Sequence, residues 1–128
     1  MKKTLIAFFL VFTLALLLPA CSGTEVKKYN ETSTTINVAP GSQFEIDLSA
    51  NDTTGYTWNK NEVYDKAYLE LVESKYKATE PVRPGSPGTQ IFVFKALKAG
   101  STTIKMTNKR SWEASAYDKT VTFNVNIK

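Results

Sequence analysis

The sequence of 128 residues contains no histidine and only one cysteine. Serine and cysteine nucleophiles are most often activated by a neighbouring imidazole, and zinc sites are usually built from histidine and cysteine. Two carboxylates suffice for glycoside hydrolysis, but the Asp and Glu residues here are scattered singly, mostly at alternating positions typical of a solvated strand face. The sequence therefore predicts a protein that is not an enzyme and that uses no metal or cofactor.

Clusters of like charge are also absent. After the amino-terminal segment, no run of basic residues is longer than a pair such as Lys109-Arg110. The formal net charge of +4 falls to +2 without residues 1–20, because Lys plus Arg drops from 16 to 14 against 12 acidic residues. Proteins that bind nucleic acids usually carry a dense basic patch, so no nucleic-acid partner is expected.

The one long apolar run lies at the amino terminus. Lys2 and Lys3 precede apolar residues 5–18, which are interrupted only by Thr13 and followed by Pro19 and a small residue. A basic start, an apolar centre and a small residue at the end are typical of a secretory signal. The run is shorter than the roughly 20 residues of a membrane-spanning helix. We therefore predict a signal peptide over residues 1–20.

The single cysteine, Cys21, stands directly after Leu-Pro-Ala. This sequence resembles the lipobox of bacterial and archaeal lipoproteins, which implies that Cys21 is lipidated. The protein is then exported and contacts the membrane only through a lipid anchor, on the cell surface or in the periplasm. Ordinary cleavage that leaves a free thiol is the alternative. Residues 21–31 are polar and are predicted to form a tether, so residues 32–128 form the single folded domain.

Short segments of alternating apolar residues fill this domain. Val121, Phe123, Val125 and Ile127 alternate most regularly, whereas 91–94 is a continuous apolar run typical of a central strand. Helical pattern is limited to a turn or two near residues 60–67. The pattern predicts an all-β fold, an immunoglobulin-like β-sandwich of about seven strands. Without a cysteine pair, burial of aromatic and aliphatic side chains, with Tyr56 and Trp58 among them, must hold the two sheets together.

One loop of the predicted sandwich, Asn51-Asp52-Thr53-Thr54-Gly55-Tyr56, has the composition of a stiff turn. Asn and Asp hydrogen-bond their own backbone, Gly55 adopts positive φ without strain, and β-branched Thr side chains have few rotamers. A stiff exposed loop loses little conformational freedom when it binds another protein. This first loop is therefore either a preorganised binding loop or an ordinary turn.

Two later loops are also unusual. The second loop, Glu80–Thr89, contains three prolines and two glycines; its alternative interpretation is a hairpin connection without a role. The third loop, Asn108–Glu113, places Trp112 near Arg110, and both residue types are enriched at interface hot spots. A Trp112 tucked back over the core is the alternative. In a seven-stranded sandwich the three loops can gather at one end.

Together these loops resemble those of chagasin-type inhibitors of papain-family cysteine peptidases. The resemblance rests on Thr-Thr-Gly-aromatic at 53–56, on Gly85–Thr89 before an aromatic strand, and on Arg110-x-Trp112, and it extends from about residue 36 to 127. The family usually has proline at the positions of Asp52 and Ser111, so this chain lacks two rigid residues of the pattern.

The resemblance implies a monomeric inhibitor that binds a papain-family cysteine peptidase reversibly and tightly by inserting the three loops into its active-site cleft. Thr53, Thr54 and Gly55 would lie over the catalytic cysteine, Trp112 would stack beside the catalytic histidine, and Arg110 would make polar contacts nearby. The implied peptidase-binding residues are Asn51, Asp52, Thr53, Thr54, Gly55, Tyr56, Gly85, Ser86, Pro87, Gly88, Thr89, Arg110, Ser111 and Trp112.

Two other functions fit the same fold. An adhesive or carbohydrate-binding module would use Trp112 and Tyr117 as stacking platforms, and it would tolerate Thr54→Ala or Gly55→Ala. An inert envelope lipoprotein would have ordinary turns and no partner at all.

Overall fold

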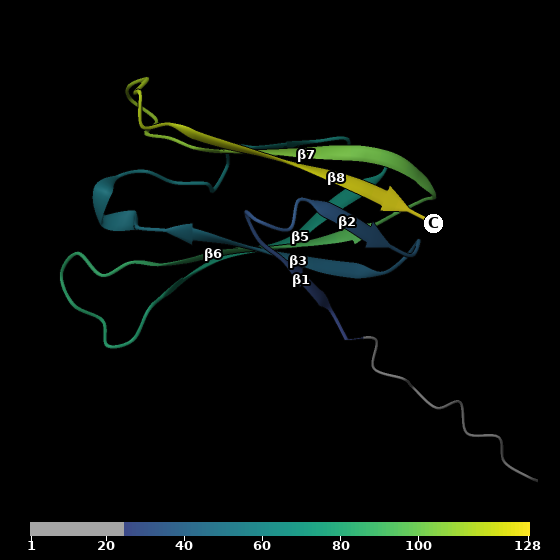
Figure 1. The fold of residues 1–128 in the computed structure, drawn as a ribbon, viewed down its shortest axis with the longest axis horizontal. Coiled ribbons are helices and arrows are strands. Elements are labelled where there is room, and N and C mark those ends of the chain that lie inside the picture. Colours follow the sequence, from purple (N-terminus) through teal and green to yellow (C-terminus); the bar gives the residue numbers. More distant parts are fainter. Residues whose placement is uncertain (1–24) are drawn as a thin grey trace, which may run out of the picture.

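The computed structural model describes residues 25–128, so the predicted signal peptide and Cys21 lie outside the described residues. Two four-stranded sheets form a sandwich (Figure 1). In order across the first sheet, the strands are β1 (Lys27–Tyr29), β3 (Gln43–Ala50), β6 (Gly88–Ala96) and β5 (Leu69–Ala78). The second sheet contains β2 (Thr35–Val38), β8 (Lys119–Ile127), β7 (Gly100–Asn108) and β4 (Glu62–Tyr64). The predicted all-β sandwich is confirmed, with eight strands rather than about seven.

The core lies between the two sheets and is built from the inward residue of each alternating pair. Phe44, Phe92, Phe94 and Phe123 are at most 1% exposed, and each contributes about 1.5–3 kcal/mol on burial. The predicted central strand is confirmed, because β6 lies between β3 and β5 and residues 91–94 are all buried. No helix within residues 25–128 has the length and apolar character needed to cross a membrane.

Part of the predicted tether belongs to the sandwich. Residues Lys27–Tyr29 form β1, which pairs in parallel with β3 at the edge of the first sheet. Lys28 Nζ lies 2.9 Å from Glu45 Oε1, and the Tyr29 ring packs edge-on against Phe44 with centroids 6.3 Å apart. The predicted boundary at residue 32 is therefore wrong. A strand of three residues leaves almost no periodic pattern in a sequence, and the polar composition of this segment is also that of a tether.

Within the segment expected to contain a helical turn near residues 60–67, Glu62–Tyr64 form a short strand, β4, and a single hydrogen-bonded turn over residues 65–68 follows it. β4 pairs antiparallel with β7, with Glu62 opposite Met106 and Tyr64 opposite Ile104. The Tyr64 ring lies 5.1 Å from that of Phe94 in an edge-to-face arrangement, so it links the second sheet to the first. A long-range aromatic contact of this kind determines the strand, and the local sequence does not show it.

Trp58 fixes the end of the sandwich from which the candidate loops project. Its side chain is 1% exposed, and its Nε1 donates a hydrogen bond of 2.9 Å to the Ser49 carbonyl oxygen. The indole therefore satisfies its one polar group while it fills the core. The predicted core role of Trp58 is confirmed, whereas Tyr56 is only half-buried and belongs to the loop network described below.

The outer face of the first sheet carries two adjacent carboxylates, Glu45 and Asp47, on β3. The pKa of Asp47 is raised to about 6. Desolvation is the largest cause, followed by the hydrogen bond with Glu45 and the negative charge of Glu45. The positive charges of Lys28 and Lys75 oppose this shift with smaller effects. One carboxylate oxygen of Asp47 is buried without a hydrogen-bond partner. The folded protein therefore favours the protonated form of Asp47 more than the unfolded chain does.

We predict that Asp47→Asn stabilises the protein at high pH relative to the wild type. Because the pKa of Asp47 is higher in the folded state, the stabilising effect of its protonated form is lost as pH rises through about 6. Chemical unfolding at pH 4 and pH 8 measures this: the stability of the variant minus that of the wild type should be larger at pH 8. An equal difference at both pH values would contradict the raised pKa.

Candidate functional site

The three loops singled out in the sequence lie together at one end of the sandwich, opposite the carboxyl terminus (Figure 1). The first loop leaves β3, the second joins β5 to β6, and the third joins β7 to β8. Since β3 and β4 belong to different sheets, the first loop crosses from one sheet to the other between the two remaining loops. The predicted gathering of the loops at one end is thus found in the structure.

The first loop contains a single turn of 3-10 helix, η1 (Asp52–Thr54). Asn51 caps it, because its Oδ1 accepts hydrogen bonds from the Thr53 amide at 3.2 Å and the Thr53 hydroxyl at 2.5 Å. The Thr54 hydroxyl donates to the Asn51 carbonyl oxygen at 2.7 Å. Gly55 ends the turn with φ of 77°, a conformation that favours glycine. Burial raises the pKa of Asp52, which lies in this turn.

The tip of the second loop is a tight turn beside the first loop. The Ser86 amide donates to the Arg83 carbonyl oxygen at 3.0 Å, and the Arg83 amide donates to Ser86 Oγ at 2.8 Å. Gly85, with φ of 81°, presents its carbonyl oxygen to Asn51 Nδ2 at 3.2 Å. The capping residue of the first loop therefore also joins the first loop to the second.

The predicted extent of the second loop is too long. Gly88 and Thr89 are the first residues of β6, where they pair with Ala50 and Ser49 of β3. Gly88 is buried, and a Cβ added there would lie 2.6 Å from the Lys77 carbonyl oxygen. Glycine is required at this position because the Tyr76 side chain and the Lys77 carbonyl oxygen of β5 leave no room for a Cβ. The projecting part of the predicted segment is Gly85–Pro87, and Gly88 and Thr89 form its base.

Trp112 of the third loop lies against the first loop. Its side chain is 66% exposed, so the alternative in which it tucks back over the core is wrong. A Cβ added at Gly55 would lie 2.5 Å from Trp112 Cη2. The indole therefore rests on the bare backbone of Gly55, and much of its surface stays open to solvent. Ser111, beside Trp112, is exposed.

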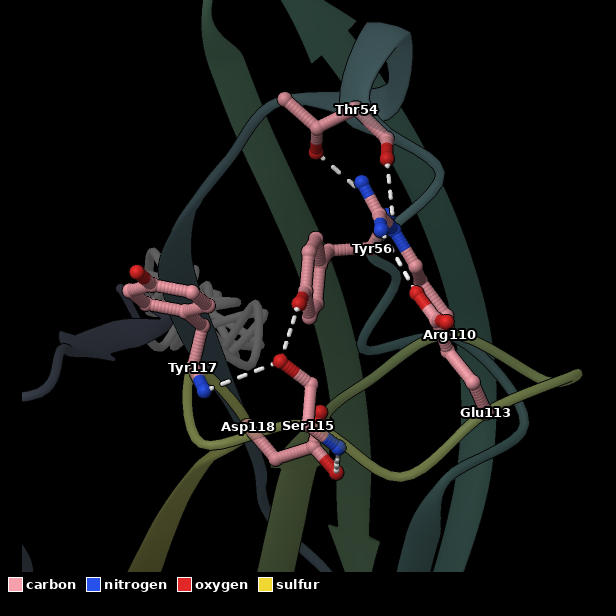
Figure 2. A network of polar contacts seen from close by, with 7 residues as sticks. All are labelled: Thr54, Tyr56, Arg110, Glu113, Ser115, Tyr117 and Asp118. Carbon is pink, nitrogen blue, oxygen red and sulfur yellow. Dashed lines mark hydrogen bonds and ion pairs between the residues drawn. The ribbon is translucent and has the colours of Figure 1, made fainter.

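Arg110 joins the third loop to the first (Figure 2). Its Nε donates to the Thr54 carbonyl oxygen at 3.1 Å, and its Nη1 lies 2.7 Å from Glu113 Oε1. The guanidinium carbon also lies 4.6 Å from the centroid of the Tyr56 ring and 5.7 Å from that of Trp112. The hydrogen bond with Glu113 raises the pKa of Arg110. In the free protein, the cation thus holds together residues on both sides of Gly55.

Two further contacts, which the sequence did not reveal, complete the connection between these loops. Thr57 and Lys109 form an isolated antiparallel bridge with two backbone hydrogen bonds of 3.1 and 3.2 Å. The Tyr56 hydroxyl donates to Ser115 Oγ at 2.8 Å (Figure 2). Only the order Ser115-x-x-Asp118, a common turn pattern, could have drawn attention to this part of the third loop, which continues to Asp118.

Comparisons with known proteins agree with this architecture. The protein-family model described as "Chagasin family peptidase inhibitor I42" matches residues 37–127. Chagasin of Trypanosoma cruzi is 30% identical over 87 residues, which cover 66% of this chain and 79% of chagasin.

Two solved structures have the same fold. The crystal structure of EhICP2, a cysteine protease inhibitor from Entamoeba histolytica, has a TM-score of 0.70 at 29% identity, over 80% of this chain and 96% of that chain. The structure of PbICP-C in complex with falcipain-2 has a TM-score of 0.54 at 18% identity, over 80% and 91% of the two chains.

The contact between Gly55 and Trp112 gives a direct test. We predict that Gly55→Ala displaces the indole and lowers the free energy of unfolding, by about 1–2 kcal/mol for the positive φ alone. Acrylamide quenching of fluorescence reports on Trp112, because Trp58 is buried, and quenching should increase in the variant.

Gly41→Ala is the matched control, since Gly41 has φ of 81° but nothing within 4 Å of an added Cβ. It should lower stability similarly and leave the quenching unchanged. Equal quenching in all three proteins would show that Trp112 does not rest on Gly55.

Proposed function

Since the chain belongs to the Chagasin family of peptidase inhibitors, we propose that it is a reversible, tight-binding inhibitor of papain-family cysteine peptidases, of which falcipain-2 is one. The three loops would enter the active-site cleft together, with residues 53–55 over the catalytic cysteine and Trp112 beside the catalytic histidine. The protein would act by occupying the cleft, without catalysis of its own and without a covalent step.

The observation that carries this proposal is the set of contacts that joins the three loops. Asn51 bonds to Gly85 of the second loop, and Arg110 and Trp112 of the third loop contact Thr54 and Gly55. Each loop is therefore held in place by another before any partner binds. Because little conformational entropy remains to be lost, an interface of about 1,600 Å² can reach nanomolar affinity, about 12 kcal/mol.

The backbone of the first loop also favours inhibition over cleavage. A peptide that is recognised by β-strand addition binds in an extended conformation, whereas residues 52–54 form a helical turn and Gly55 has positive φ. Alignment of a peptide bond with a nucleophile requires an extended chain on both sides of that bond. The peptide bonds in this turn have no such extended chain beside them. The loop would therefore fill the cleft without becoming a substrate.

We further propose that the inhibitor is an exported, monomeric lipoprotein. The support for export and anchoring is the signal-like segment and the lipobox-like position of Cys21 in the sequence. A lipid at Cys21 would be separated from β1, which begins at Lys27, by only a few residues. The domain would then be held close to the membrane surface.

An adhesive or carbohydrate-binding module stays the second candidate. Its support is the exposure of two aromatic side chains at the loop end, 66% for Trp112 and 84% for Tyr117. Sugars stack on exposed aromatic rings, and such stacking would not require the Thr54 side chain.

Titration of papain and falcipain-2 with the protein separates these two functions. We predict saturable, reversible inhibition that Trp112→Ala weakens by about 2 kcal/mol, or about 30-fold, if Trp112 is a hot spot. Thr54→Ala should weaken it about tenfold, because the bond to the Asn51 carbonyl oxygen is lost. Absence of inhibition at micromolar protein would overturn the proposal, and retention of sugar binding in Thr54→Ala would favour the adhesive module.

Arg110 should contribute by positioning the first loop. We predict that Arg110→Gln weakens inhibition about tenfold, because the Thr54 contact and the stacking on Tyr56 are both lost. Glu113→Gln is the control: the ion pair is partly exposed, so its loss should cost less than about 1 kcal/mol, or fivefold. Inhibition constants of the two variants that match each other would argue against a positioning role for the guanidinium.

A further inference from the structure

We infer that Tyr117 is an additional contact residue of this inhibitor. Its side chain binds the peptidase surface beside the cleft and contributes to the choice of target. The inference rests on the proposed function and extends the binding surface beyond the fourteen residues implied by the resemblance. Tyr117 lies near the end of the third loop, between Trp112 and the start of β8.

Tyr117 is the most exposed of the large apolar and aromatic side chains in residues 25–128, at 84%. Its neighbours on both sides, Ala116 and Asp118, do not shield the ring, because alanine is small and the Asp118 carboxylate turns back to the Ser115 amide at 3.4 Å. The ring and its hydroxyl are therefore free to meet a partner. Tyrosine is among the residue types enriched at interface hot spots, since it combines a large apolar face with a polar tip.

The backbone that carries this side chain is held in a turn. The Asp118 amide donates to the Ser115 carbonyl oxygen at 3.2 Å, and the Tyr117 amide donates to Ser115 Oγ at 3.1 Å. With the backbone fixed, only the two side-chain torsions of Tyr117 are left to be ordered on binding. Tyrosine in such a position provides contact area at a low entropic cost.

This turn is joined to the first loop through a shared atom. Ser115 Oγ accepts hydrogen bonds from both the Tyr117 amide and the Tyr56 hydroxyl. Figure 2 shows Tyr117 on the side of Tyr56 opposite to Arg110 and Glu113, with its ring directed away from the other labelled side chains. The third loop thus brings two exposed aromatic side chains to the first loop: Trp112 rests on Gly55, and Tyr117 follows the turn that is joined to Tyr56.

The expected partner of Tyr117 is the wall of the peptidase, next to the cleft that the first loop enters. The inhibitor is held there by its other contacts, so a side chain that projects from the same rigid group of loops meets that wall without a separate association step. A ring with a hydroxyl at its tip fits an apolar shelf with a polar rim. Walls differ among related peptidases more freely than a catalytic centre does, so Tyr117 would favour some targets over others.

The test compares Tyr117→Ala with the wild type against papain and falcipain-2, by measurement of association and dissociation rates. For the peptidase that the wild type binds more tightly, we expect dissociation about tenfold faster, an association rate within threefold, and an unchanged thermal midpoint. Tyr117→Phe should stay within threefold of the wild type. Leu97→Ala is the control, because Leu97 is 43% exposed at the opposite end of the sandwich, and its rates should not change.

Several outcomes would overturn the inference. Dissociation of Tyr117→Ala within twofold of the wild type would do so and would leave the proposed function intact. The inference would also be wrong if Tyr117→Ala altered only glycan binding or self-association. Failure of the wild type itself to inhibit either peptidase would instead remove the proposed function on which the inference rests.

Discussion

The loop end of the sandwich depends on the absence of a side chain at residue 55. Gly55 ends the 3-10 turn with a left-handed backbone, and its missing Cβ leaves the space that Trp112 occupies. Any other residue there would oppose both the conformation of the first loop and the approach of the third. The two loops can therefore form one surface only around a glycine, and Arg110 contacts the residues before and after it, Thr54 and Tyr56.

The sandwich provides this end with a rigid base. Trp58 fills the core directly after the first loop and donates to Ser49 on β3, just before that loop. The two ends of the loop are thus tied together by a partly buried hydrogen bond. On the other side, the Thr57–Lys109 bridge connects the loop to the strand that leads into Arg110 and Trp112. A displacement of the whole first loop would have to break the backbone hydrogen bonds of this bridge. A substitution at the tip of the loop can therefore change the tip without moving the core.

Much of the fold was readable from the sequence because strands with one buried face have a period of two. This period predicts the long strands β3, β6, β7 and β8. The grouping of the loops at one end follows from the sandwich that these strands predict. β1 and β4 were missed or misassigned, because three residues cannot establish a period and their pairing depends on distant strands. The same limit explains Gly88, which looks like a loop residue by composition but sits where β5 and β6 approach closely.

The candidate site was predicted as a set of residue types, and its internal contacts were not. Gly55, Arg110 and Trp112 drew attention because glycine at a turn and exposed Arg and Trp are locally unusual. Nothing local indicated that Arg110 would contact the Thr54 carbonyl oxygen or that Ser115 would accept from Tyr56, since these pairs are 56 and 59 residues apart. Contacts of this sequence separation follow from the packing of the sandwich, which brings three turns to one end.

These contacts also explain how the loops keep their shape with Asp52 and Ser111 at positions where related inhibitors usually have proline. A proline stiffens one residue by fixing φ, whereas the contacts here stiffen the loops by tying them to one another. Of the interactions of Arg110, the pair with Glu113 is partly exposed and weak by itself. The contacts of Arg110 that tie the third loop to the first are those of Nε with the Thr54 carbonyl oxygen and of the cation with the Tyr56 ring. Rigidity in this protein is therefore a property of three loops in contact, and each loop alone would be more mobile than its counterpart with prolines.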